Sequence, residues 1–209
     1  MTSNIAVSAE SLADTPRSLF AISYELAACV ALVALSLALR IAELDTVPLT
    51  NLEAHQALAA WRALHPNLPG SVIVPESPLL FLLHGIGFSI FGGAEFAVRL
   101  FTALAGTGLV MMPLLFRDVL GRARAFAFSL MLAFSPVLLV ASRFDSPVVW
   151  TLLSAGLLLW ALRRWWLSQN HAFALAAGGF SAALLLLTDP AGWWFGLALA
   201  GAAAVALAW

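Results

Sequence analysis

The chain has 209 residues, of which 62% are hydrophobic and only 10% charged, and its mean hydropathy is +0.96. A soluble domain is typically about one quarter charged, so this composition excludes an ordinary soluble protein and indicates an integral membrane protein. The net charge of −1, without a run of basic residues, predicts no nucleic-acid partner. Cys29 is the single cysteine, which excludes a disulfide within the chain.

Residues 1–19 are polar and are expected to form a cytoplasmic N-terminus, followed by a transmembrane domain over residues 20–209. A helix that crosses a bilayer needs about 20 mostly apolar residues. The predicted fold is therefore all-α, a polytopic bundle in contact with membrane lipids, with about six spans and external interfacial helices. The predicted spans are 20–41, 96–116, 125–142, 147–163, 171–188 and 191–209.

The apolar stretch 77–93 is shorter and interrupted by glycines, which favours an interfacial helix over a span. Its His84 is interpreted as a hydrogen-bonded interior histidine. If this stretch does not cross, both arginine clusters of the chain fall on the cytoplasmic side, as the positive-inside rule prefers. Residues 43–95 then form an external loop with amphipathic helices. The two clusters contain Arg117, Arg122 and Arg124, and Arg163 and Arg164.

Within this loop, "LDTVPLTNLEAHQALAAW" gathers most of the polar groups. Thr50 and Glu53 have the spacing of a capping box, in which each side chain bonds the backbone amide of the other residue. The helix that follows has an apolar stripe opposite His55 and Arg62, typical of a helix on a membrane surface. Two roles for Glu53 stay open, a helix start and a general base.

Three motifs, taken in order, resemble the GT-C superfamily of membrane glycosyltransferases, which includes protein O-mannosyltransferases and the lipid A aminoarabinose transferase. They are "RIAELDTVPLTNLEA", "SPLLFLLHGIGFSIFGGAEFAVRL" and "FSPVLLVASRF" followed by an aspartate. The resemblance covers roughly residues 35–190. We expect a chain like the N-terminal half of a GT-C fold, in the cytoplasmic (inner) membrane of a bacterium.

The resemblance implies transfer of a sugar from a polyprenyl-phosphate carrier to an acceptor. A carboxylate takes the acceptor's proton, and arginines, sometimes with a divalent cation, balance the charge of the phosphate. The implied catalytic residues are Glu53 and Asp145. Arg40, Arg99 and His55 are the candidates for substrate binding. No residue is assigned to a metal, and a divalent cation is expected only with activity.

The chain departs from the family pattern where its carboxylates are expected. Leu52 and Val148 occupy the positions of the usual aspartates, and "LLTDPAG" with Asp189 stands where many members have a lysine. A second function is therefore open, a non-catalytic structural or accessory subunit of a larger complex, with other membrane subunits as partners. For Asp145, the local alternatives are pairing with Arg143 and capping of the next helix.

Overall fold

The computed structural model describes residues 24–42, 44–67, 74–167, 171–188, 192–194, 196–198 and 201. In this part of the chain every regular element is helical, which confirms the all-α prediction. The helices are α1 (Tyr24–Ile41), α2 (Asn51–Leu64), α3 (Pro78–Phe91), α4 (Glu95–Leu115), α5 (Arg117–Leu120), α6 (Arg122–Phe134), α7 (Pro136–Arg143), α8 (Pro147–Leu167) and α9 (His171–Thr188).

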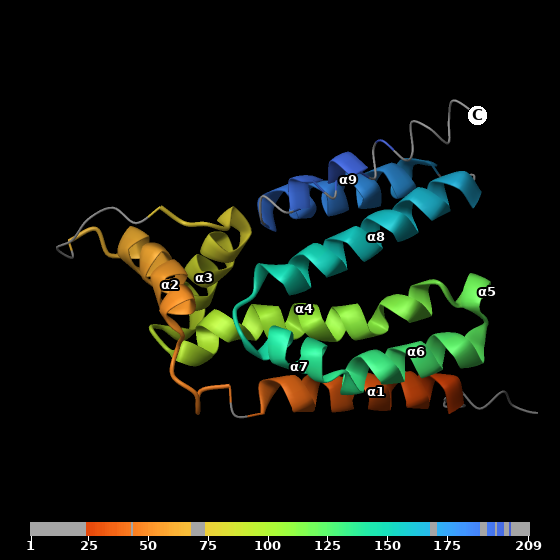
Figure 1. Ribbon diagram of the computed structural model, residues 1–209, viewed down its shortest axis with the longest axis horizontal. Coiled ribbons are helices and arrows are strands. Elements are labelled where there is room, and N and C mark those ends of the chain that lie inside the picture. The colour runs from red at the N-terminus through yellow and green to blue at the C-terminus, as the bar shows by residue number, and fades with distance from the viewer. Residues whose placement is uncertain are drawn as a thin grey trace, which may run out of the picture.

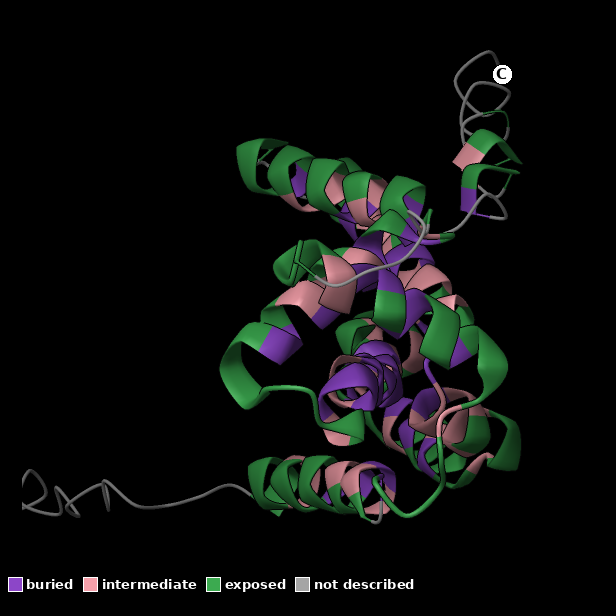
Figure 2. Cartoon of the chain, turned by 90° about the vertical axis from the view of Figure 1, so that its left-hand side faces the viewer, coloured by how far each residue is buried: buried purple, intermediate pink, exposed green. Residues whose placement is uncertain are grey.

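Helix α4 is the centre of the bundle and packs against α1, α3, α6, α7 and α8 (Figure 1). Of an apolar 18-residue stretch of α4, 56% is buried, compared with 17% of the corresponding stretch of α1 and 22% of that of α9. Figure 2 shows the same difference, with buried residues gathered in the middle of the molecule and α1 largely exposed. Because the exposed faces of the outer helices are also apolar, they suit contact with lipid rather than with water.

Among the described residues, three helices are long and apolar enough to cross a membrane, α1, α4 and α9. Helices α6 and α7 make a fourth if the bent pair counts as one span. This pattern supports a membrane protein, but the predicted six spans are not confirmed. Helix α8 ends in two arginines and two tryptophans and is not one of the candidate spans, and the predicted span 191–209 lies largely outside the described residues.

The break between α6 and α7 bends the predicted span 125–142 by 59°. Ser135 is in an extended conformation with ψ 117°, and Pro136 follows as the first residue of α7. Proline has no backbone N–H and its ring collides with the preceding turn, so it tends to kink or break a helix. The apolar composition of this segment predicted a span, and its proline explains the bend.

Helices α2 and α3 form a pair at the end of the bundle opposite α5 (Figure 1). Thr50 and Glu53 form both halves of the capping box, as predicted. Ser77 caps α3 by accepting a hydrogen bond from the Leu80 amide, and Gly92 ends α3 with a positive φ of 72°. At 1.5 Å per residue the 14 residues of α3 span about 21 Å, less than the roughly 30 Å of a bilayer core.

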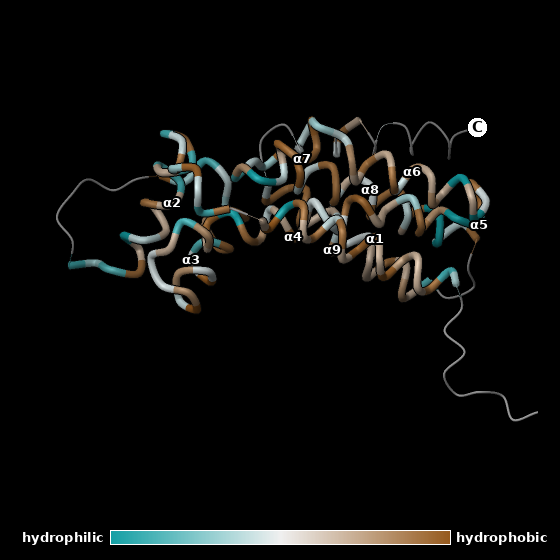
Figure 3. Tube along the Cα trace, turned by 90° about the horizontal axis from the view of Figure 1, so that it is seen from below, coloured by the Kyte–Doolittle hydropathy of each residue, from teal (hydrophilic) through white to brown (hydrophobic). Residues whose placement is uncertain are grey.

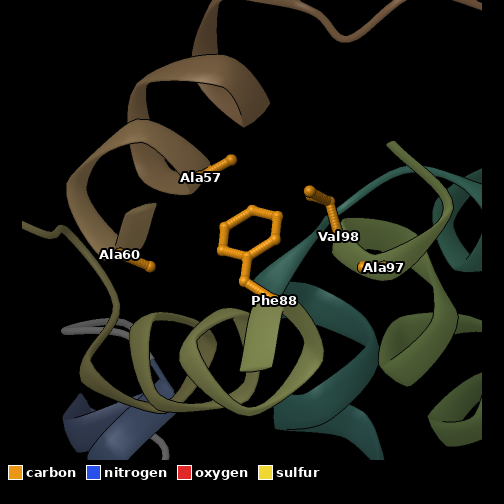
Figure 4. Packing of buried hydrophobic residues seen from close by; sticks show 5 residues of the cluster. All are labelled: Ala57, Ala60, Phe88, Ala97 and Val98. Atoms are coloured by element: carbon orange, nitrogen blue, oxygen red, sulfur yellow. The ribbon is translucent and has the colours of Figure 1, made fainter. Parts of the chain in front are cut away.

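A small apolar core holds this pair against α4. The Phe88 ring of α3 lies between two alanines of α2 and the first turn of α4 (Figure 4). Trp61 packs edge-on against the same ring, with 5.4 Å between centroids. Small residues let the helices approach closely around one large aromatic side chain. The buried members of this core are Ala57, Ala60, Phe88, Ala97 and Val98.

Candidate functional site

Five buried polar side chains meet where α2, α3, α4 and the turn between α7 and α8 come together. We call this group the polar cluster. Burying polar and charged groups costs free energy unless they are hydrogen-bonded or paired, so such a group requires an explanation. Its members are Glu53, His84, Arg99, Thr102 and Asp145.

Glu53 is the hub of the cluster, with only 3% of its surface exposed. Its Oε1 accepts hydrogen bonds from Arg99 Nε at 3.0 Å and from the Asp145 amide at 2.8 Å. Its Oε2 accepts from Arg99 Nη2 at 2.8 Å, from the Thr50 amide at 2.8 Å and from Thr50 Oγ1 at 3.0 Å. One carboxylate thus joins the start of α2 to α4 and to the turn before α8.

Arg99 is as fully engaged as Glu53. A guanidinium has five N–H donors in a planar fork. Two form the bidentate pair with Glu53, and the other bonds go to backbone carbonyls of the loop before α2, those of Leu44 (3.0 Å), Val47 (2.7 Å) and Pro48 (3.2 Å). The guanidinium carbon also lies 5.5 Å from the centre of the Phe144 ring. Arg99 therefore fixes the loop backbone onto the end of α4.

The protonation of Glu53 follows from these contacts. Burial alone would raise the pKa of its carboxyl, but the hydrogen bonds from Arg99, Asp145 and Thr50, together with the charge of Arg99, lower the pKa to about 2. Hydrogen bonds and an opposite charge favour the ionised form. At neutral pH Glu53 is a carboxylate with weak affinity for a proton, which is a poor property for a general base.

The lowered pKa predicts how stability depends on pH. Because the pKa of Glu53 is about 2 in the folded protein and near 4.5 ordinarily, the folded state binds fewer protons across this range. The stabilisation from Glu53 is complete above pH 4.5 and is lost as the pH falls toward about 2. We expect Glu53→Gln to lack this contribution, so the difference in unfolding free energy between the native chain and the variant should shrink between pH 5 and 2. An unchanged difference would contradict the prediction.

Asp145 is the second carboxylate of the cluster, and its partners differ from those expected. It does not pair with Arg143, whose Nη2 donates instead to the Ala42 carbonyl at 2.7 Å. Asp145 Oδ1 accepts from Thr102 at 3.2 Å, and its Oδ2 lies 3.0 Å from His84 Nε2. The ring N–H of His84 is not aligned with that oxygen, so the two groups are close without a well-formed hydrogen bond. His84 is fully buried, as predicted, but the predicted hydrogen bond is not found, because neither ring nitrogen has a hydrogen-bond partner among the described residues.

The other two predicted binding residues lie outside the cluster. Arg40 is fully buried in the last turn of α1, where its Nη1 donates to the carbonyl and the hydroxyl of Ser36. Its Nε and Nη2 have no hydrogen-bond partner among the described residues. His55 is exposed on the opposite face of α2 from Glu53. Of the five predicted site residues, the fold therefore brings together Glu53, Arg99 and Asp145.

The comparisons with known proteins give no family for this chain. No family model, no curated protein and no solved structure matches it. The resemblance to GT-C glycosyltransferases therefore stays a prediction from sequence motifs. The site has to be interpreted from its own geometry.

Sequence reasoning did not identify Thr102 as a member of the site. Thr102 follows Arg99 by three residues, a spacing that places both side chains on one face of a helix. The sequence did contain a signal for Thr102, since it is a polar residue in an apolar helix, on the same face as Arg99. His84, a lone imidazole in the apolar α3, gave a signal of the same kind.

The contacts of the cluster join segments that lie far apart in the chain. Its two carboxylates are buried; both oxygens of Glu53 and Oδ1 of Asp145 accept from donors of the protein itself, whereas Oδ2 of Asp145 has no donor among the described residues. Among the described residues, no group of three or more His, Cys, Asp or Glu side chains is placed to hold a metal ion. The chemistry that this arrangement supports best is charge-assisted hydrogen bonding between distant parts of the chain.

Proposed function

We propose that this chain is a non-catalytic structural subunit of a larger membrane assembly, with an ancestor of the GT-C type. The observation that carries the proposal is the saturated carboxylate of Glu53. A general base needs a lone pair within hydrogen-bond reach of the acceptor's proton. Both oxygens of Glu53 are instead occupied by Arg99, Thr50 and the backbone of Asp145.

The positions of the two missing aspartates support the same proposal. Leu52 is 51% exposed and Val148 is 53% exposed. Apolar side chains there can neither accept a proton nor bind a cation. Asp145, the other candidate base, is only 4% exposed and lies against His84 and Thr102. In the proposed function, neither Glu53 nor Asp145 is therefore available to a sugar donor.

A structural role would also account for the polar cluster. The cluster and the apolar core around Phe88 fix α2 and α3 in one position on the end of α4. The outer sides of these two helices remain apolar, with Leu58, Leu82 and Ile90 at 40%, 54% and 65% exposure. In the proposed function this rigid pair is the surface on which a neighbouring subunit rests.

The catalytic part of the proposal is tested with purified full-length protein and a panel of polyprenyl-phosphate sugars. We expect no sugar release above the background without protein. Turnover of any donor that is lost in Asp145→Asn, with the variant still folded, would overturn the proposal and favour a glycosyltransferase.

The structural part is tested in gently solubilised membranes, by measuring the protein mass of the particle that contains the chain. We expect a mass well above the 22.2 kDa of one chain. Ile90→Ala on α3 should reduce this mass, whereas Leu186→Ala, a similarly exposed residue of α9 (55%), serves as the matched control. A particle that holds one chain only would contradict a subunit role.

A further inference from the structure

An apolar groove of about 400 Å³ lies along the bundle, with α4 in the middle, α6 and α7 on one side and α8 on the other. This volume is within the roughly 300–1,000 Å³ of small-molecule sites. Every residue that lines the groove is apolar. Residues from the four helices include Leu109, Met112, Phe128, Leu132, Leu138 and Leu152.

One end of the groove reaches the α5 end of the bundle. Phe116, the residue before α5, and Leu120, the last residue of α5, both line the groove. On α6, Arg124 precedes Phe128 and Leu132 at intervals of four residues, so the three side chains follow one stripe of the helix. By this spacing Arg124 lies one turn before Phe128 on the same stripe of α6, and Arg117, the first residue of α5, is adjacent in sequence to Phe116.

The charges at this end leave the two arginines uncompensated. Glu25 pairs with Arg122 at 2.8 Å, and Asp118 pairs with Arg163 at 2.7 Å. The hydrogen bond from Arg163 lowers the pKa of Asp118, which keeps that pair ionised at neutral pH. Arg117 and Arg124 are exposed, and within the described part of the chain neither has an acidic partner.

We propose that this groove binds an anionic membrane lipid, with one acyl chain along the apolar walls and the phosphate against Arg117 and Arg124. A hydrocarbon chain suits a groove without polar atoms, and two free guanidinium groups at its end supply the complementary charge for a phosphate. Figure 3 shows the same division, with hydrophilic residues gathered around α5 and hydrophobic ones along the neighbouring helices. The inference does not depend on the proposed structural function.

The test titrates the detergent-solubilised full chain with phosphatidylglycerol or phosphatidylcholine of identical acyl chains and measures bound lipid by native mass spectrometry. We expect phosphatidylglycerol to bind more tightly. Replacing both arginines, Arg117→Gln with Arg124→Gln, should weaken its binding roughly 25-fold, since each cation contributes roughly fivefold. The same double variant should weaken phosphatidylcholine binding much less, because the choline cation already balances the charge of its phosphate.

Arg62→Gln is the matched control, because it removes the same charge from α2, at the end of the bundle opposite α5 (Figure 1). At about 0.15 M salt its effect should be less than about twofold, given a screening length of about 8 Å. Leu152→Trp fills the groove and should weaken both lipids. An equal loss of phosphatidylglycerol affinity in the double arginine variant and in the control would contradict the proposed lipid site. So would glycerol phosphate that binds as tightly as phosphatidylglycerol.

Discussion

Glu53→Gln should lower the free energy of unfolding by about 3–5 kcal/mol, because it removes the one carboxylate that is hydrogen-bonded to the buried Arg99 guanidinium among the described residues. Arg99 is only 2% exposed, so water cannot replace the lost carboxylate. A neutral amide also presents donors where the carboxylate only accepted, opposite the amides of Thr50 and Asp145. The measurement is chemical unfolding in mixed micelles at neutral pH.

Glu76→Gln makes the same chemical change at an exposed position and should alter the unfolding free energy by less than about 0.5 kcal/mol. We also expect proteolysis between α2 and α3 to become faster in Glu53→Gln, since the carboxylate holds α2 on the bundle. A Glu53→Gln chain as stable as Glu76→Gln would show that the polar cluster does not hold these segments together.

Gly106→Ala should destabilise the protein by roughly 1–3 kcal/mol, the cost of forcing an extra carbon into a packed interior. A Cβ at this position of α4 would collide with the Ser142 side chain of α7 and lie 3.0 Å from Nε of Arg40. Neither neighbour can move easily, because Ser142 donates to the Leu139 carbonyl and Arg40 is fully buried.

Gly179→Ala is the control for Gly106→Ala. Gly179 also lies in a candidate spanning helix, α9, but a Cβ there meets no atom within 4 Å. Its replacement should be neutral, or slightly stabilising because alanine favours a helix. Equal melting temperatures for the two variants would show that α4 and α7 are not in close contact at Gly106.

Much of the fold follows from local patterns in the sequence. The capping box at Thr50 and Glu53 requires only four neighbouring residues, and the apolar run at 171–188 coincides with α9. The number of spans was harder to predict, because hydropathy counts apolar residues without regard to a proline such as Pro136. The bend at Pro136 and the arginines at the end of α8 reduce the number of candidate spans below the six that composition suggested.

The partners within the site could not be predicted from a single sequence. The bond between Arg99 and Glu53 joins residues 46 positions apart, and that between Asp145 and Glu53 joins residues 92 apart. Local spacing carries no information on such contacts, so the nearby Arg143 seemed the natural partner for Asp145. Burial decides otherwise, since Asp145 faces inward to His84 and Arg143 bonds to the end of α1.

These long separations impose an order on biogenesis. A growing chain leaves the ribosome from its N-terminus, so α2 and α3 are complete before α4 and long before residue 145. Glu53 first gains its bidentate bonds when Arg99 emerges, and the amide that completes its coordination arrives only with Asp145. A nascent chain that stalls before the turn at residues 144–146 therefore has α2 and α3 held only by Arg99 and the core around Phe88, without the bond from the Asp145 amide.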